Sequence, residues 1–269
     1  MNRIAILLFS ALIIFASGCA SVRPPSTAAT APATSASPSS APPHDAWARV
    51  LQKFVDDEGR VNFLALSRDR ADLDQMVAYV YAVSPKNRPD LFPTAQHVLA
   101  FHINAYNALA MYKVIEVGIP ETNAGLRKIF FFAFGKVQVG GEAISLYDYE
   151  NKVIRPLGDP RIHMALNCMA VSCPRLPRQP FLPDTLNAQL DAETQRFFNE
   201  PRNATVDTAN KVVKTSEILS FFPEDFLAKA PSLIAFINQY RDPKLGKISD
   251  NFKVEYFPYD WTFNRQPGT

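Results

Sequence analysis

Residues 94–117 read T-A-Q-H-V-L-A-F-H-I-N-A-Y-N-A-L-A-M-Y-K-V-I-E-V and decide the fold. Apolar side chains recur along this stretch with the spacing of an α-helix. They include Val98, Phe101, Ala105, Leu109 and Tyr112. Thr94 can cap the first turn, and Gly118 can end the last one. We therefore predict a long, buried central helix around which the rest of the domain packs.

The segments on both sides of this helix predict a mainly helical domain with two small β pieces. Further helices are expected at residues 45–55, 66–83, 146–154, 184–199, 216–222, 223–228 and 232–240. β-Hairpins are expected at residues 129–144 and 204–215, and the tail at 253–263 is expected to end extended. Runs of helices combined with local hairpins indicate the α+β fold class.

The first eighteen residues have the pattern of a lipoprotein signal peptide. Arg3 precedes an apolar run at residues 4–15, which is too short to span a bilayer, and small residues then lead to Cys19. This pattern predicts a diacylglycerol on the Cys19 thiol, cleavage before Cys19 and acylation of the new amine. The alternative is an ordinary signal peptide that is cut near Ala20. Because neither residue after Cys19 is the aspartate associated with inner-membrane retention, we expect the outer membrane.

Residues 19–43 are expected to be a tether, and residues 44–269 a single periplasmic domain. The tether is nearly all Ser, Thr, Ala and Pro, so it cannot bury enough apolar surface to offset its ordering entropy. In the whole chain, 47% hydrophobic and 12% aromatic residues support a real core. A formal charge of +2, without a basic stripe, argues against nucleic acid. The expected partners are the membrane, through the lipid, and an unidentified small molecule or envelope component.

A second stretch, residues 161–176, concentrates the groups that chemistry requires. It reads R-I-H-M-A-L-N-C-M-A-V-S-C-P-R-L. A disulfide between Cys168 and Cys173 would close a small loop in an oxidising compartment and stabilise the fold by about 2 kcal/mol. Alternatively, one cysteine is a nucleophile and His163 is its base. On a strand His163 and Ala165 would share one face, and Cys168 would lie on the opposite face unless the chain turns at Asn167. Cys173 lies in a loop that could fold back towards His163, so it is the better candidate nucleophile.

A metal site is the third reading of the same side chains. His163, Cys168, Cys173 and His102 could supply four ligands for zinc. The spacing H-x4-C-x4-C is not one of the familiar pairs of ligands, and a disulfide would exclude it. We therefore expect no metal and no other cofactor.

Amide side chains within the central helix are a further candidate feature. Asn104 and Asn107 lie three residues apart, so they share a helix face. An unpaired buried amide costs about 1–3 kcal/mol, so both must find partners. Either they bond to irregular backbone, such as the loop at residues 168–174, or Asn104 stabilises an oxyanion. In the second case Asn107, Tyr106 and Asn167 would bind the substrate.

Glu150 is the natural third member of a catalytic set. It lies shortly before the His163 segment and could hydrogen-bond one imidazole nitrogen. The structural alternative is a salt bridge from Glu150 to Arg155 or Arg161. Asp260, in a Tyr-Asp-Trp sequence, is a rival partner for His163 or for an arginine.

Several motifs resemble those of the uncharacterised DUF547 family. Residues 101–109, F-H-I-N-A-Y-N-A-L, resemble its W-I-N-x-Y-N helix, although His102 stands where that pattern has Trp. Residues 144–151, 159–168 and 172–176 continue the resemblance, and Y-D-W-T-F-N at 259–264 is similar to its Y-D-W-S-L-N close. The motifs follow the family's order from about residue 45 to residue 264. The resemblance implies the fold of a bacterial DUF547 lipoprotein more than it implies a reaction.

These observations lead to two hypotheses. The first is a thiol hydrolase or transferase that acts on an amide or ester of the cell envelope. In it Cys173 attacks, His163 is the base, Glu150 orients His163, and Asn104 holds the developing charge. The second is a non-enzymatic envelope binding protein in which a Cys168–Cys173 disulfide is structural.

Overall fold

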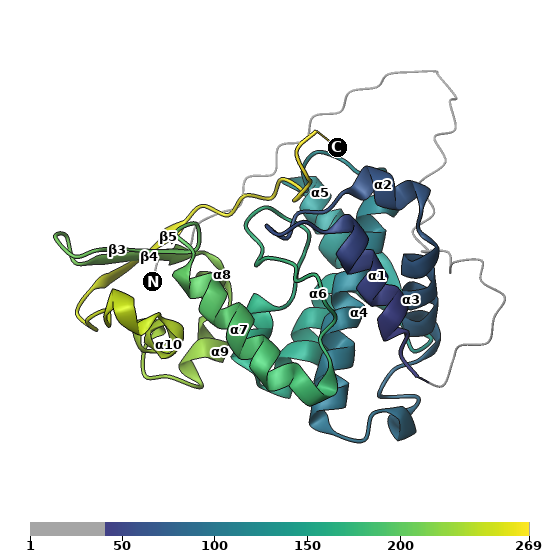
Figure 1. Cartoon of the computed structure of the whole chain (residues 1–269), viewed down its shortest axis with the longest axis horizontal. Coiled ribbons are helices and arrows are strands. Elements are labelled where there is room, and N and C mark those ends of the chain that lie inside the picture. Colours follow the sequence, from purple (N-terminus) through teal and green to yellow (C-terminus); the bar gives the residue numbers. More distant parts are fainter. Residues whose placement is uncertain (1–40, 269) are drawn as a thin grey trace, which may run out of the picture.

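The computed structural model describes residues 41–268 (Figure 1). The predicted signal peptide, the lipidation site at Cys19 and most of the predicted tether lie outside this range. The described helices are α1 His44–Phe54, α2 Phe63–Arg68, α3 Ala71–Ala82, α4 Ala95–Glu116, α5 Leu126–Ile129, α6 Leu146–Asp148, α7 Leu186–Asn199, α8 Ile218–Phe221, α9 Pro223–Leu227 and α10 Leu233–Tyr240. The strands are β1 Lys136–Val139, β2 Glu142–Ser145, β3 Ala204–Asp207, β4 Val212–Ser216 and β5 Lys253–Phe257. This is the α+β class predicted above.

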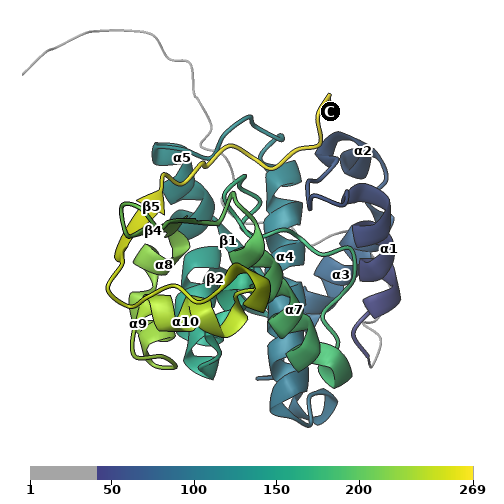
Figure 2. The same cartoon turned by 60° about the vertical axis from the view of Figure 1, so that its left-hand side comes forward.

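Helix α4 is the buried centre of the larger lobe, as the sequence predicts. The Thr94 hydroxyl accepts a hydrogen bond from the His97 amide at 3.3 Å and caps its first turn. Every side chain from Leu99 to Val114 is buried, so the helix has no solvent-facing stripe along most of its length. Helix α3 packs against α4 and against α1, and Figure 2 shows these elements side by side. The same lobe holds the larger of two hydrophobic clusters.

The helix expected at residues 66–83 is divided into α2 and α3. The side chain of Asn62 accepts a hydrogen bond from the Ala65 amide at 2.9 Å, so α2 begins earlier than predicted. Helix α2 ends at Arg68, and the next residue, Asp69, has a φ of −140°, which is not helical. The break lets α2 and α3 take different directions. The apolar residues of these two short helices follow the periodicity of one longer helix, which is why the sequence predicts a single helix here.

The aromatic run at the start of the first predicted hairpin is helical, which corrects that prediction. Only β1 and β2 form the hairpin, while α5 continues into a π-helical turn, η2, Phe130–Phe134. The Lys113 ammonium of α4 donates hydrogen bonds to the carbonyl oxygens of Phe131 and Gly135. Carbonyls at a helix end lack partners within the helix, so this lysine stabilises the helical form. The side chain of Phe131 packs on Phe263 in the core.

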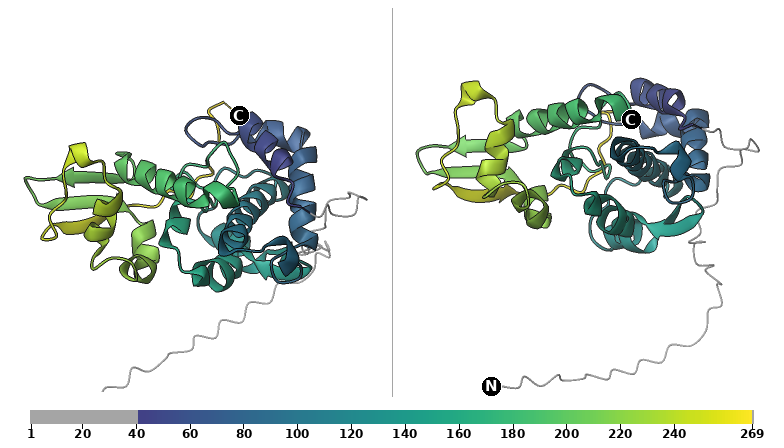
Figure 3. Two further views of the ribbon diagram at one scale, coloured as in Figure 1. Left: turned by 60° about the horizontal axis from the view of Figure 1, so that its bottom comes forward. Right: turned by 90° about the horizontal axis from the view of Figure 1, so that it is seen from below.

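The smaller lobe has its own hydrophobic cluster and a three-stranded sheet (Figure 3). Strands β3 and β4 form the hairpin predicted at residues 204–215, and the predicted helices of this lobe are present as α7, α8, α9 and α10. Strand β5 pairs with β4 in parallel, from Val212 opposite Lys253 to Ser216 opposite Phe257. The chain then returns to the larger lobe, where Phe263 bridges to Ala170. The tail therefore ties the two lobes together.

Among residues 41–268, none of the helices combines the length and the apolar character that a bilayer crossing requires. The prediction of a single domain over residues 44–269 stays a prediction.

We predict that Gly59→Ala destabilises the fold more than Gly158→Ala does. Both glycines have positive φ, +76° and +79°, so each alanine costs about 1–2 kcal/mol of backbone strain. A Cβ at Gly59 would also lie 2.6 Å from the Leu176 amide nitrogen, whereas nothing lies within 4 Å at Gly158. Overpacking adds about 1–3 kcal/mol. Urea unfolding measures both free energies, and equal losses would contradict the close packing of this turn.

Candidate functional site

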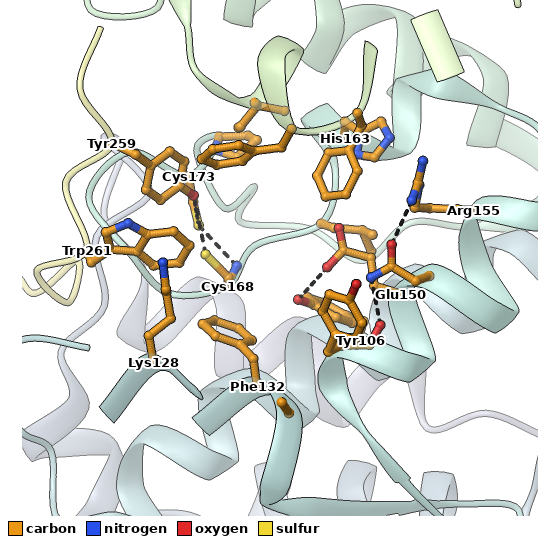
Figure 4. A pocket seen from close by; sticks show the side chains of 18 of the residues that line it. Tyr106, Lys128, Phe132, Glu150, Arg155, His163, Cys168, Cys173, Tyr259 and Trp261 are labelled. Carbon is orange, nitrogen blue, oxygen red and sulfur yellow. Dashed lines mark hydrogen bonds between the residues drawn. The ribbon is translucent and has the colours of Figure 1, made fainter. Parts of the chain in front are cut away.

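A cavity of about 660 Å³ opens where the two lobes meet (Figure 4). Its wall is formed by α4, the segment from α5 to η2, the turn η3 Tyr149–Ile154, α8 and the C-terminal tail. The loop at residues 168–174, called here the cysteine loop, also contributes to it. The wall is largely aromatic, through Phe132, Phe221, Phe222, Tyr259 and Trp261. Five predicted site residues also line it, namely Tyr106, Glu150, His163, Cys168 and Cys173. The cavity is therefore the candidate site.

The two cysteines lie side by side on one wall, and both are free thiols in the structure. The Cys168 backbone amide donates a hydrogen bond to the Cys173 sulfur at 3.1 Å. The Tyr259 hydroxyl lies 3.2 Å from the Cys173 sulfur and 3.4 Å from the Cys168 sulfur. Tyr259 thus joins the site from the tail, 86 residues beyond Cys173.

The two thiols differ in acidity. Burial raises the pKa of Cys173, but hydrogen bonds from the Cys168 thiol, the Tyr259 hydroxyl and backbone amides lower it more, so the net shift is downward. The pKa of Cys168 is raised well above its ordinary value, first because its thiol donates to Cys173 and then because it is buried. Cys173 is therefore the sulfur that more readily becomes a thiolate.

Buried amides hold the cysteine loop in place. The Asn107 side chain donates to the Ala165 carbonyl oxygen at 2.9 Å and accepts from the Asn167 amide at 2.7 Å. Asn167 in turn donates to the Pro174 carbonyl oxygen at 2.7 Å and accepts from the Met169 amide at 2.7 Å. Neither amide is among the residues that line the cavity. Of the two alternatives for these residues, the structure has the one in which they bind irregular backbone.

Asn104 does not reach the cavity, which corrects its assignment to the oxyanion. Its side-chain oxygen accepts hydrogen bonds from the Trp47 indole at 3.2 Å and from the Phe181 amide at 3.0 Å. Its amide nitrogen donates to the Phe181 carbonyl oxygen at 2.7 Å. The acceptor is occupied, and Asn104 instead fixes the chain before α7 against α4.

His163 lies in a 3₁₀ turn, η5 Pro160–Met164, and not in a strand. Its Nε2 atom lies 2.7 Å from a carboxylate oxygen of Asp225, and its ring stacks on Phe222 with centroids 4.4 Å apart. Arg155 also binds Asp225 through Nε at 2.7 Å. Figure 4 shows His163 and Arg155 on the opposite side of the cavity from the cysteines. No hydrogen bond joins His163 to either thiol within the described residues, so the expected thiol–imidazole pair is not formed.

Asp225 is the carboxylate partner of the His163 imidazole, a role that the sequence analysis proposes for Glu150. Burial raises the pKa of Asp225, but the hydrogen bonds from His163 and Arg155 lower it more, so its pKa lies well below the ordinary value. A short helix that begins Pro-Glu-Asp gives no sign of such a role, because a carboxylate in a first helical turn is common. Asp260, the other proposed partner, accepts from the Thr262 amide at 2.8 Å and shapes the tail instead.

Glu150 faces the middle of the cavity and is paired with Tyr106. The Tyr106 hydroxyl donates to a Glu150 carboxylate oxygen at 3.0 Å. Burial raises the pKa of Glu150, and this exceeds the lowering by His163, Tyr106 and Arg155. Neither arginine proposed as a salt-bridge partner is paired with it, since Arg155 binds Asp225 and Glu224 and Arg161 binds Asp159 and Asp191. Glu150 therefore holds its proton more strongly than an exposed glutamate does.

The side chains proposed for a metal do not converge. His102 lies in α4 with its Nδ1 atom 2.8 Å from the Tyr149 hydroxyl, and burial lowers its pKa to about 4. His163 is engaged by Asp225. Within residues 41–268, no three His, Cys, Asp or Glu side chains are grouped so that they could hold a metal ion.

We predict that Asp225→Asn lowers stability at pH 7 by about 1–3 kcal/mol, the usual worth of a hydrogen bond to a charged group. Because the folded-state pKa of Asp225 is depressed, its contribution is present above the ordinary carboxyl pKa and is lost as the pH falls below it. The difference between variant and unsubstituted protein should therefore shrink between pH 5 and pH 2, as measured by urea unfolding. Asp184→Asn, at the exposed turn Pro183–Thr185, is the control. A difference that is independent of pH would contradict this ionic arrangement.

Comparison with known proteins supports the predicted DUF547 resemblance over part of the chain. A DUF547 domain, described as a protein of unknown function, is found at residues 92–198. Comparison with curated proteins and with solved structures gives no significant match. The matched range holds Tyr106, Glu150, His163 and both cysteines, whereas Asp225 and Tyr259 lie beyond it. The chain thus contains a DUF547 domain that includes most of the cavity's polar groups.

Proposed function

We propose that this protein is a thiol hydrolase or transferase that acts on an amide or ester, with Cys173 as the nucleophile. The observation that carries the proposal is the placement of the Cys173 sulfur on the cavity wall, where the Cys168 amide and the Tyr259 hydroxyl both bind it. Hydrogen bonds to sulfur stabilise the thiolate, which is the nucleophilic form of cysteine. The cavity volume suits a small organic group or the end of a larger substrate.

In this proposal Glu150 is the proton donor, whereas the base that the sequence analysis proposes, His163, is not paired with either thiol. Burial raises the pKa of Glu150 and so favours the protonated form more than in an ordinary glutamate, and the Tyr106 hydroxyl lies 3.0 Å from its carboxyl oxygen. His163 and Asp225 act as positioning residues, because they fix Phe222 and Arg155 on the cavity wall.

The reaction then proceeds in two steps. The Cys173 thiolate attacks the carbonyl carbon and forms a thioester, while the bond to the amine or alcohol breaks and that group leaves with the proton of Glu150. In the second step water, or an acceptor amine or alcohol, attacks the thioester. It gives its proton to the Glu150 carboxylate, the acyl group leaves the sulfur, and the Cys173 thiolate is restored.

The aromatic wall supports a second candidate function, which is binding without turnover. Stacked and tilted rings, such as Tyr259 and Trp261 with centroids 4.4 Å apart, offer a planar apolar surface to a ligand. The adjacent sulfurs could then be joined as a structural disulfide in an oxidising compartment. This candidate predicts that ligands bind and leave unchanged.

We further propose that the domain is anchored by lipid on Cys19 in the periplasm, with the outer membrane as its site. The support is the apolar run at residues 4–15, the small residues before Cys19 and the Pro-rich stretch after it. We expect that cells given labelled palmitate transfer the label to the full-length protein and not to Cys19→Ser. Cys168→Ser is the matched control and should keep the label. Label retained by Cys19→Ser would contradict this anchor.

The thiol proposal predicts selective alkylation. At pH 7 iodoacetamide should modify Cys173 faster than Cys168, because the pKa of Cys173 is lowered and that of Cys168 is raised. Tyr259→Phe removes a hydrogen bond from the sulfur and should slow the modification of Cys173 several-fold, whereas Tyr256→Phe on β5 should not. Mass spectrometry of peptides measures both rates. A faster Cys168 would contradict the assignment of the nucleophile.

Turnover is tested with a panel of chromogenic ester and amide probes. Any activity found should fall at least about a hundredfold in Cys173→Ser and in Glu150→Gln, the range usual for loss of a nucleophile or a general acid. Folding of each variant is checked by urea unfolding. Undiminished turnover in Cys173→Ser would end the thiol mechanism. A probe that binds tightly and is never converted would favour the binding function.

A further inference from the structure

The segment that borders the cavity, residues 126–134, has two apolar faces. Phe131 is 3% exposed and packs into the core, as expected for the inner face. The outer face carries Leu126, Ile129, Phe130 and Phe134, with exposed fractions of 74%, 44%, 62% and 61%. Large apolar side chains rarely gather on the surface of a protein without a binding role. This group, called here the outer patch, has no partner within the described residues.

The outer patch is a fixed surface. Helix α5 and the turn η2 are continuous, so Leu126, Ile129, Phe130 and Phe134 follow one another at intervals that keep them on one face. The rings of Phe130 and Phe134 lie 5.6 Å apart and contact each other. The Lys113 ammonium holds the end of the segment through the carbonyl oxygens of Phe131 and Gly135. The exposed rings are therefore presented by a helix that is anchored in the core.

The charged side chains of the segment that carries the outer patch are all positive. Residues 124–141 contain Arg127, Lys128 and Lys136 and no Asp or Glu. Arg127 makes no ion pair within residues 41–268, and the Lys128 ammonium lies 4.4 Å from the centre of the Trp261 ring. Only Lys136 approaches a carboxylate, that of Asp148, at 4.0 Å. The outer patch thus combines exposed aromatic rings with the positive charges of Arg127 and Lys128, neither of which makes an ion pair within the described residues.

We propose that the outer patch docks on an anionic lipid surface. Helices that lie in the membrane interface bury Phe and Leu at the level of the headgroups and place Lys and Arg against anionic lipids. Each basic side chain near such a surface contributes about 1 kcal/mol. A symmetric contact between two copies would bring Arg127 and Lys128 against their own equivalents, so charge disfavours self-association. The docking surface goes beyond the proposed function and does not depend on it.

Docking would place the mouth of the cavity beside the lipid surface. Lys128, Ile129 and Phe132 of the same segment line the cavity, and Figure 4 shows Lys128 and Phe132 along one side of it. The outer patch and the cavity wall therefore adjoin on one short helical segment, and Ile129 belongs to both. A change in how this segment is held would reach both surfaces.

The test uses the full-length protein in vesicles of phosphatidylethanolamine and phosphatidylglycerol whose acyl chains are partly brominated. Phe130→Trp introduces an indole into the outer patch, and Leu245→Trp introduces one on the distant turn η7 Pro243–Leu245, where Leu245 is 55% exposed. Bromine quenches indole fluorescence only at short range, so an anchor elsewhere in the chain does not produce the signal. The unsubstituted protein supplies the background of Trp47 and Trp261.

We expect the lipid to quench the indole of Phe130→Trp at least about twofold more than that of Leu245→Trp, and iodide in the water to do the reverse. Adding Arg127→Glu to Phe130→Trp should reduce the lipid quenching, whereas adding Lys244→Glu, the same change of charge near Leu245, should not. Equal quenching of the two indoles by lipid would overturn the proposal. So would an indole at Phe130→Trp that is shielded from iodide but not quenched by lipid, since a protein partner would then cover the patch.

Discussion

The hydrogen bonds that Asn107 makes from inside α4 support the rest of the site. A helix that is buried on all sides has no water for its polar side chains, so Asn107 must find protein partners. Its side chain bonds to the Ala165 carbonyl oxygen and to the Asn167 backbone amide. The Asn167 side chain in turn donates to the Pro174 carbonyl oxygen. The loop between them has little regular structure to fix it. The position of Cys173 therefore depends on two amides that never reach the cavity.

The cavity exists because the chain crosses between lobes several times. The α7 to α10 lobe contributes Asp225, which binds His163 across 62 residues of sequence. The tail contributes Tyr259 before Phe263 enters the core of the larger lobe. The tail thus brings Tyr259 to the cavity wall, and Asp225 holds His163, which also lines it. Both lobes must therefore be in place before the site is complete.

Two carboxyl groups, Glu150 on the cavity wall and Asp225 behind His163, have opposite tendencies. Asp225 receives hydrogen bonds from His163 and Arg155, so its charged form is stabilised although burial opposes it. Among residues 41–268 the Tyr106 hydroxyl is the one group hydrogen-bonded to the Glu150 carboxyl, and burial raises the pKa of Glu150. Groups whose environments separate their pKa values in this way are suited to different tasks, one as a fixed charge and the other as a proton donor. The proposed assignment of roles follows from this difference.

Local pattern determined which segments are helices and hairpins, since the apolar periodicity of α4 and the turn residues of β3 and β4 act over short distances. It also determined that thiols, His163 and Glu150 belong to one region of the chain. Tertiary structure decided the form of residues 129–134, where the Lys113 ammonium favours a helix over the strand that an aromatic run suggests. It also decided the partners: Asp225 for His163, Tyr259 for Cys173 and Phe181 for Asn104. A hydrogen bond forms only within about 3 Å, and which groups come that close is set by how the elements pack, not by their order in the chain.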